Sequence, residues 1–60
     1  MSATLTAFEA GQHVRIIHGP LRDFGGFIAW IEETGRLAIS VEGLGTGIHV
    51  IVDFEAVEIS

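Results

Sequence analysis

The 60-residue sequence contains no cysteine, no lysine and no asparagine. Without cysteine, the chain can form neither disulfide bonds nor thiolate metal sites, which is consistent with an intracellular protein. Without asparagine, it has no acceptor for N-linked glycosylation. Without lysine, it cannot form a P-loop, because that phosphate-binding motif requires a lysine side chain.

Positive charge and long apolar runs are also scarce. Three arginines stand against eight acidic residues, which gives a formal net charge of −5. Proteins bind phosphate backbones through many basic residues, so nucleic acid is a poor partner for this chain. No apolar run approaches the roughly 18 residues of a membrane span, and residues 1–7 lack the basic and apolar regions of a signal peptide. We therefore expect a cytoplasmic protein without a membrane segment.

Apolar residues, by contrast, are abundant. They make up 48% of the chain, whereas charged residues make up 18%, and this composition predicts an ordered core. A chain of this length forms one domain, which buries only about 60% of the surface that its unfolded form exposes. We expect residues 1–7 to be a flexible leader or linker stub and residues 8–60 to be the folded domain.

Short β-rich segments separated by turn residues predict an all-β fold. The clearest segment is residues 36–42, in which Leu37, Ile39 and Val41 alternate with smaller or polar residues. No window shows a sustained helical period. Five strands are expected, at residues 14–18, 28–31, 36–42, 48–52 and 57–59, which indicates a small barrel or sandwich.

Between positions 8 and 59, a fixed order of turn and strand residues stands out: Gly19-Pro20, Asp23-Phe24 followed by Gly26, Arg36-Leu37 and Asp53-Phe54. This order resembles the C-terminal KOW domain of NusG-type transcription factors. The resemblance implies a five-stranded SH3-like barrel, in agreement with the expected strands. It also implies a module without catalytic activity that binds proteins in transcription elongation, termination or antitermination. The implied partners are NusE, which is also a small-subunit ribosomal protein, and the termination factor Rho.

The resemblance also implies a partner-binding face, and the chain departs from the family pattern there. Leu21 occupies a position that is usually Phe, and residues 43–46 read Gly-Leu-Gly-Thr where the family usually has Ile-Phe-Gly-Arg. An aromatic residue and an arginine, residue types that often dominate interface energies, are therefore missing from the turn. The expected partner-binding residues are Leu21, Phe24, Gly43, Leu44, Gly45 and Thr46.

Four apolar residues stand where the family usually has polar, solvent-facing ones: Ile17, Phe27, Trp30 and Ile51. They either belong to the core or are scattered singly over the surface, or they form an apolar patch of the kind that marks interfaces. A patch would predict self-association to a homo-oligomer, with Trp30 as the anchor. The alternative function is therefore an engineered or standalone SH3-like barrel that self-associates and has no role in transcription.

No group of residues predicts catalysis, a cofactor or a metal site. Residues 43–47 have G-x-G-x-G spacing without a following helix, which favours a turn over a phosphate site. His13 and His18 are five positions apart, so an ideal strand would point them to opposite faces. Glu32 and Glu33 are adjacent in a loop, without the cleft that acid–base catalysis requires.

The remaining expectations concern the core and the last turn. We expect Phe8, Phe24 and Phe54 to lie in the core, with Phe24 partly shared with the partner-binding face. We expect the carboxylate of Asp53 to accept backbone N–H groups in a tight turn at residues 53–56.

Overall fold

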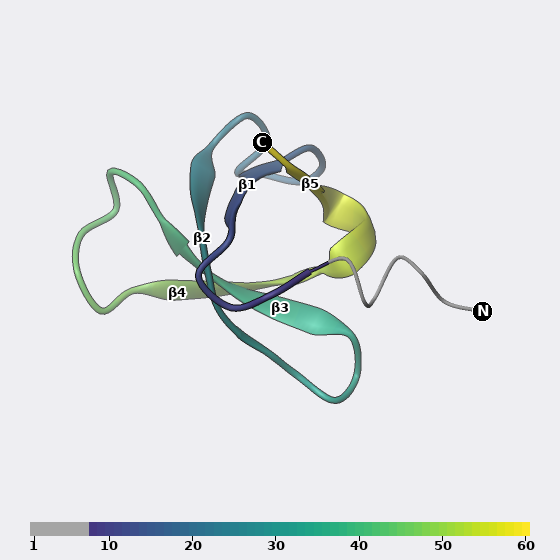
Figure 1. Ribbon diagram of the computed structural model, residues 1–60. Coiled ribbons are helices and arrows are strands. Elements are labelled where there is room, and N and C mark those ends of the chain that lie inside the picture. Colours follow the sequence, from purple (N-terminus) through teal and green to yellow (C-terminus); the bar gives the residue numbers. More distant parts are fainter. Residues whose placement is uncertain (1–7) are drawn as a thin grey trace.

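The computed structural model describes residues 8–60, so the expected leader at residues 1–7 lies outside the described residues. Residues 8–60 form five strands and one short 3-10 helix (Figure 1), which confirms the expected all-β fold. The elements are β1 (His13–Ile16), β2 (Gly25–Ile31), β3 (Arg36–Val41), β4 (His49–Asp53), η1 (Phe54–Ala56) and β5 (Val57–Ile59).

All five strands belong to one antiparallel sheet in the order β4-β3-β2-β1-β5. The sheet curls so that β1 and β5 lie across from β3 and β4, while β2 runs between the two groups (Figure 1). This is the five-stranded SH3-like barrel that the sequence and its family resemblance predict. The sheet still has two edge strands, β4 and β5, because these stand at the ends of the strand order.

The core lies inside this curl and is made of alternate residues of the strands. In β3, Leu37, Ile39 and Val41 are all buried, as their alternation predicts. In β1, Val14 and Ile16 are buried while Arg15 between them is exposed. The buried cluster consists of Phe8, Val14, Ile16, Ile28, Leu37, Ile39, Val41 and Val57, with Leu21, Leu44, Val50, Val52 and Phe54 packed against it.

Two glycines are required by the backbone of β2 and β3. Gly35 closes the hairpin between them with φ of 91°, and its N–H donates to the carbonyl of Glu32 at 3.0 Å. Gly26 leaves no space for a Cβ between β2 and β3: a Cβ there would stand 2.4 Å from the carbonyl oxygen of Ser40 and 2.9 Å from Ile39 Cγ2. Only glycine fits at position 26 without movement of the strands.

Several boundaries differ from the sequence prediction. β1 ends at Ile16, two residues earlier than expected, although the N–H of Ile17 still donates to the carbonyl of Ala56 at 2.7 Å on the β5 side. β2 begins at Gly25, three residues earlier than expected, because the glycine pair is part of the ladder to β1.

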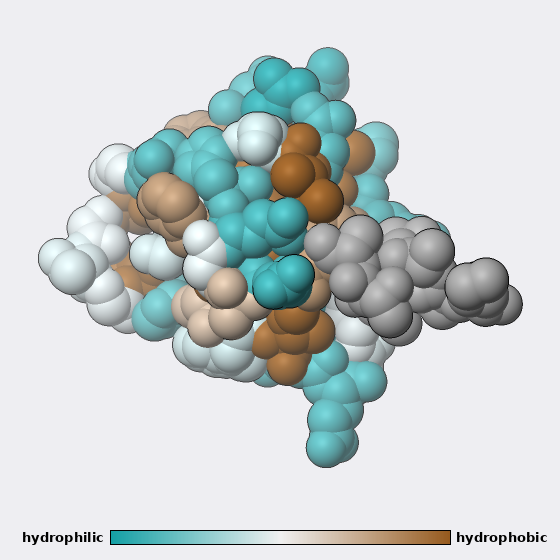
Figure 2. Space-filling view, viewed as in Figure 1, coloured by the Kyte–Doolittle hydropathy of each residue, from teal (hydrophilic) through white to brown (hydrophobic). Residues whose placement is uncertain are grey.

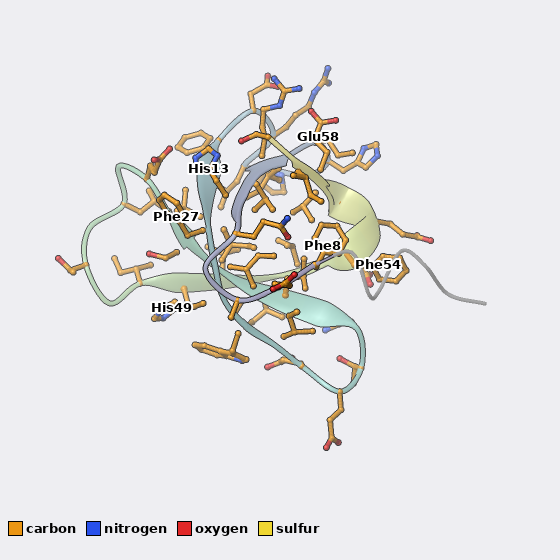
Figure 3. The ribbon with its side chains drawn as sticks, in the orientation of Figure 1. Phe8, His13, Phe27, His49, Phe54 and Glu58 are labelled. Atoms are coloured by element: carbon orange, nitrogen blue, oxygen red, sulfur yellow. The ribbon has the colours of Figure 1, made fainter. Side chains whose placement is uncertain are left out.

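Two side-chain expectations near the turns are wrong. Asp53 precedes η1 but makes no side-chain capping hydrogen bond, and the other end of the turn is closed by the N–H of Val57, which donates to the carbonyl of Phe54. Phe24 is 41% exposed rather than buried, since it lies in the loop before β2, outside the curl of the sheet. Phe8 is buried and Phe54 half-buried against the same cluster, and both lie on the η1 side of the barrel (Figure 3).

Candidate protein-binding surfaces

The first candidate surface, here called the turn face, consists of Leu21, Phe24 and residues 43–46. Two loops that are distant in sequence form it, and one backbone contact brings them together. The N–H of Glu42 donates to the carbonyl of Gly25 at 2.9 Å, which places the start of the β3–β4 turn beside the end of the β1–β2 loop. The residues expected for partner binding therefore lie at one end of the barrel.

Within the turn face, the exposed apolar surface comes mainly from Phe24. Leu21 and Leu44 are half-buried and pack against the core. A hydrogen bond from the N–H of Phe24 to the carbonyl of Leu21, at 3.0 Å, stabilises the loop. Asp23, just before Phe24, has a positive φ of 77°. Asp is among the few residues that adopt a positive φ readily. Phe24 is thus presented to solvent on a fixed backbone.

The second candidate surface, here called the outer face, is the outside of β2, β3 and β4. Phe27, Trp30 and Ile51 are 46%, 45% and 42% exposed. The strand register places Trp30, Ala38 and Ile51 in one row across the three strands, and Phe27, Ser40 and His49 in the next. The three large apolar residues therefore share one face.

A β-bulge explains how Phe27 and Trp30 reach the same face although they are three positions apart. The register between β2 and β3 shifts between Ile28 and Trp30, which leaves Ala29 without a partner. An extra residue in one strand reverses the alternation beyond it. Ala38 shows how closely the outer face is packed, because its small side chain is 0% exposed between its larger row neighbours Trp30 and Ile51.

Two histidines complete the outer face. The His13 ring meets Phe27 edge-on with ring centroids 4.8 Å apart, and the His49 ring lies 5.0 Å from that of Trp30 (Figure 3). His13 Nε2 is 3.5 Å from the Glu42 carboxylate, and its Nδ1 shares a hydrogen bond with the Ser60 hydroxyl. These neighbours were not among the predictions from the sequence, although the alternation in residues 48–52 already places His49 on the same side as Ile51.

Ile17 does not belong to the outer face. Its backbone is bonded to Ala56, next to β5, and its side chain is half-buried. Figure 2 shows that hydrophobic residues reach the surface at several separate places between hydrophilic ones in the view that it presents. The four residues singled out from the sequence are therefore distributed as three on the outer face and one elsewhere.

Between residues 8 and 60 there is no detectable pocket and no cluster of three or more His, Cys, Asp or Glu side chains that could hold a metal ion. The described part of the chain also has no helix of the length and hydropathy needed to cross a membrane.

Comparison with known proteins gives homologues at the level of sequence. The transcription termination/antitermination protein NusG of Escherichia coli (strain K12) is 41% identical over 54 residues, which cover 88% of this chain. NusG of Pasteurella multocida (strain Pm70) is 38% identical over 52 residues, or 85% of the chain. The chain spans only 30% and 28% of these two proteins. No family model matches the chain.

Comparison with solved structures supports the fold. A chain in the crystal structure of the MjSpt4:Spt5 complex (conformation B) superposes with a TM-score of 0.77. The match covers 87% of this chain and 36% of the Spt4:Spt5 chain. Its sequence identity of 23% supports a similarity of fold alone. The NusG alignments show that this chain is homologous to the C-terminal part of NusG, and its fold is consistent with that of a NusG-like KOW domain.

Proposed function

We propose that this domain is a non-catalytic protein-binding module that acts in transcription elongation, termination or antitermination. It docks a protein partner through the turn face and requires no cofactor. The observation that carries the proposal is the 41% identity to NusG over 88% of the chain, since NusG is named for transcription termination and antitermination.

The geometry of the turn face supports docking at this end of the barrel. Phe24 is an aromatic side chain exposed on a loop that is fixed by hydrogen bonds, and aromatic residues are frequent anchors of interfaces. Residues 43–46 lie beside it and carry no charge, so a partner can approach without displacing a charged side chain. Leu21 and Leu44 support the surface from below because they are packed on the core.

The partners we propose are a NusE-type ribosomal protein and Rho. RNA is a weaker candidate because the chain has a net charge of −5 and only three arginines. A protein that neutralises few phosphates binds nucleic acid weakly. A titration with single-stranded RNA at low salt is therefore expected to leave the amide spectrum of the domain unchanged.

The test is a titration of the ¹⁵N-labelled domain with NusE and, separately, with Rho, followed by amide chemical shifts. We expect shifts concentrated at Phe24 and residues 43–46 with at least one partner. Phe24→Ala should weaken that binding by about tenfold or more, as truncation of an interface anchor does.

Phe27→Ala is the matched control, because Phe27 is a phenylalanine of similar exposure that lies on the outer face. It should leave the affinity unchanged. The proposal is refuted if neither partner shifts the turn face, or if Phe27→Ala weakens binding as much as Phe24→Ala.

A further inference from the structure

The outer edge of β4 is free of backbone pairing within residues 8–60. β4 pairs with β3 alone and stands at the end of the strand order. None of the other backbone hydrogen bonds of the described residues involves β4. A strand edge of this kind is a template for pairing with a further strand.

The hydrogen bonds of β3 show which residues of β4 face this free edge. The N–H of Glu32 donates to the Arg36 carbonyl at 2.8 Å, and the N–H of Glu42 donates to the Gly25 carbonyl at 2.9 Å. The even-numbered residues along β3 therefore direct their N–H and C=O groups toward β2. Because these directions alternate along a strand, Leu37 and Ile39 face β4 and bond to their partners Val52 and Val50. The remaining residues of β4, His49, Ile51 and Asp53, direct their N–H and C=O groups outward.

The sequence of β4 lacks the usual protection of an edge strand. Natural edge strands are commonly blocked by lysine, proline, a bulge or an inward-pointing charge. Residues 48–52 read Ile-His-Val-Ile-Val, with three β-branched residues in the strand itself and no proline, lysine or acidic residue before Asp53. The strand pairs with β3 in continuous register, without a bulge.

We propose that two copies of this chain associate by antiparallel pairing of their β4 edges, with Ile51 of one copy opposite Ile51 of the other. This register uses the whole strand. It sets His49 opposite Asp53 of the second copy, and Asp53 opposite His49 of the second copy. Val50 and Val52 then face each other on the core side of the joined sheet.

Charge complementarity between His49 and Asp53 favours this register over one centred on Asp53. His49, Ile51 and Asp53 all have exposed side chains on the outer face. In the proposed register each Asp53 carboxylate meets an imidazole, which can donate an N–H to it whether neutral or protonated. Moving the centre of pairing to position 53 would place the two Asp53 carboxylates opposite each other, and like charges directly opposite destabilise a strand pair.

The pairing also assigns different roles to the exposed apolar residues of the outer face. Ile51 lies at the junction and becomes covered by its counterpart. Trp30 and Phe27 lie two strands away from β4 and stay exposed on the continuous ten-stranded sheet that two five-stranded copies would form. The interface formed by the two β4 strands, here called the seam, is small. Interfaces of less than about 1,200 Å² are typical of weak, reversible complexes.

The first test is sedimentation equilibrium over a concentration series up to about 1 mM, the range appropriate to a weak complex. The wild-type chain should show a reversible monomer–dimer equilibrium. Ile51→Glu should weaken dimerisation by about tenfold or more, because it places two carboxylates opposite each other. Ile59→Glu is the matched control, since Ile59 is an isoleucine of similar exposure on the other edge strand, β5, and it should leave the equilibrium unchanged.

The second test concerns the register. His49→Asp alone should weaken the dimer, because it sets aspartates opposite one another at both ends of the seam. The double variant His49→Asp with Asp53→His should restore it, since each imidazole again meets a carboxylate. Circular dichroism of each variant verifies that the barrel is intact.

A wild-type chain that stays monomeric at all concentrations would overturn the proposal. So would a dimer that Ile51→Glu does not weaken, or one that the double variant does not restore. Partner binding at the turn face is measured separately by the titrations with NusE and Rho.

Discussion

Replacing Gly26 with alanine tests how closely β2 and β3 approach each other. The added methyl would stand 2.4 Å from the Ser40 carbonyl oxygen and 2.9 Å from Ile39 Cγ2. The carbonyl belongs to the backbone of β3 and is fixed by the ladder, so the strands must separate. Overpacking of this kind costs about 1–3 kcal/mol, a large fraction of the roughly 3–9 kcal/mol expected for a domain of this length.

The assay is thermal unfolding followed by circular dichroism. In a domain of this size, a loss of 1 kcal/mol lowers Tm by about 4–8 °C, so Gly26→Ala should lower it by about 5–20 °C. Gly25→Ala is the matched control. Its methyl would meet only the flexible ends of Glu42 and His13, at 3.0 and 3.5 Å, which can move aside. Equal Tm values for the two variants would refute the close approach of the strands at Gly26.

Two further predictions concern the loop and the surface of the barrel. Asp23 has φ of 77°; since valine tolerates this conformation poorly and glycine readily, Asp23→Val should be about 1–2 kcal/mol less stable than Asp23→Gly in urea unfolding. Arg15 forms an ion pair with Glu58, its register partner on β5, and both side chains are about half exposed. Arg15→Ala should cost no more than about 1 kcal/mol, and the difference from wild type should shrink in high salt. A larger, salt-independent loss would show that Arg15 acts through packing instead.

The parts of the fold that could be predicted from sequence are those that depend only on residues close together in the chain. In β3, the alternation of Leu37, Ile39 and Val41 specifies the buried side because one apolar face suffices to stabilise a strand. Gly35 marks the β2–β3 turn because that backbone requires a positive φ. Such signals are local and can be read without knowledge of the neighbouring strands.

The parts that could not be predicted depend on contacts between segments. Phe24 was expected to be buried but is exposed, because the loop before β2 is fixed by bonds to Ile16 and Leu21 that hold it outside the barrel. For the turn face, the family resemblance supplied the candidate residues. The sequence alone did not show that Glu42 and Gly25 bring the two loops together.

The bulge at Ala29 also depends on the neighbouring strand, and it determines which residues of β2 lie on the outer face. Without it, Trp30 would follow the same alternation as Ile28 and point into the barrel. The interior is filled by aliphatic side chains such as Ile16, Leu37 and Ile39, and an indole added there would overpack it. The bulge leaves one small residue unpaired and keeps Trp30 outside, in register with Ala38. Position 29 carries no glycine, proline or turn residue that would predict a bulge. The bulge follows instead from the size of Trp30 and from the limited space inside the barrel, neither of which a local sequence pattern shows.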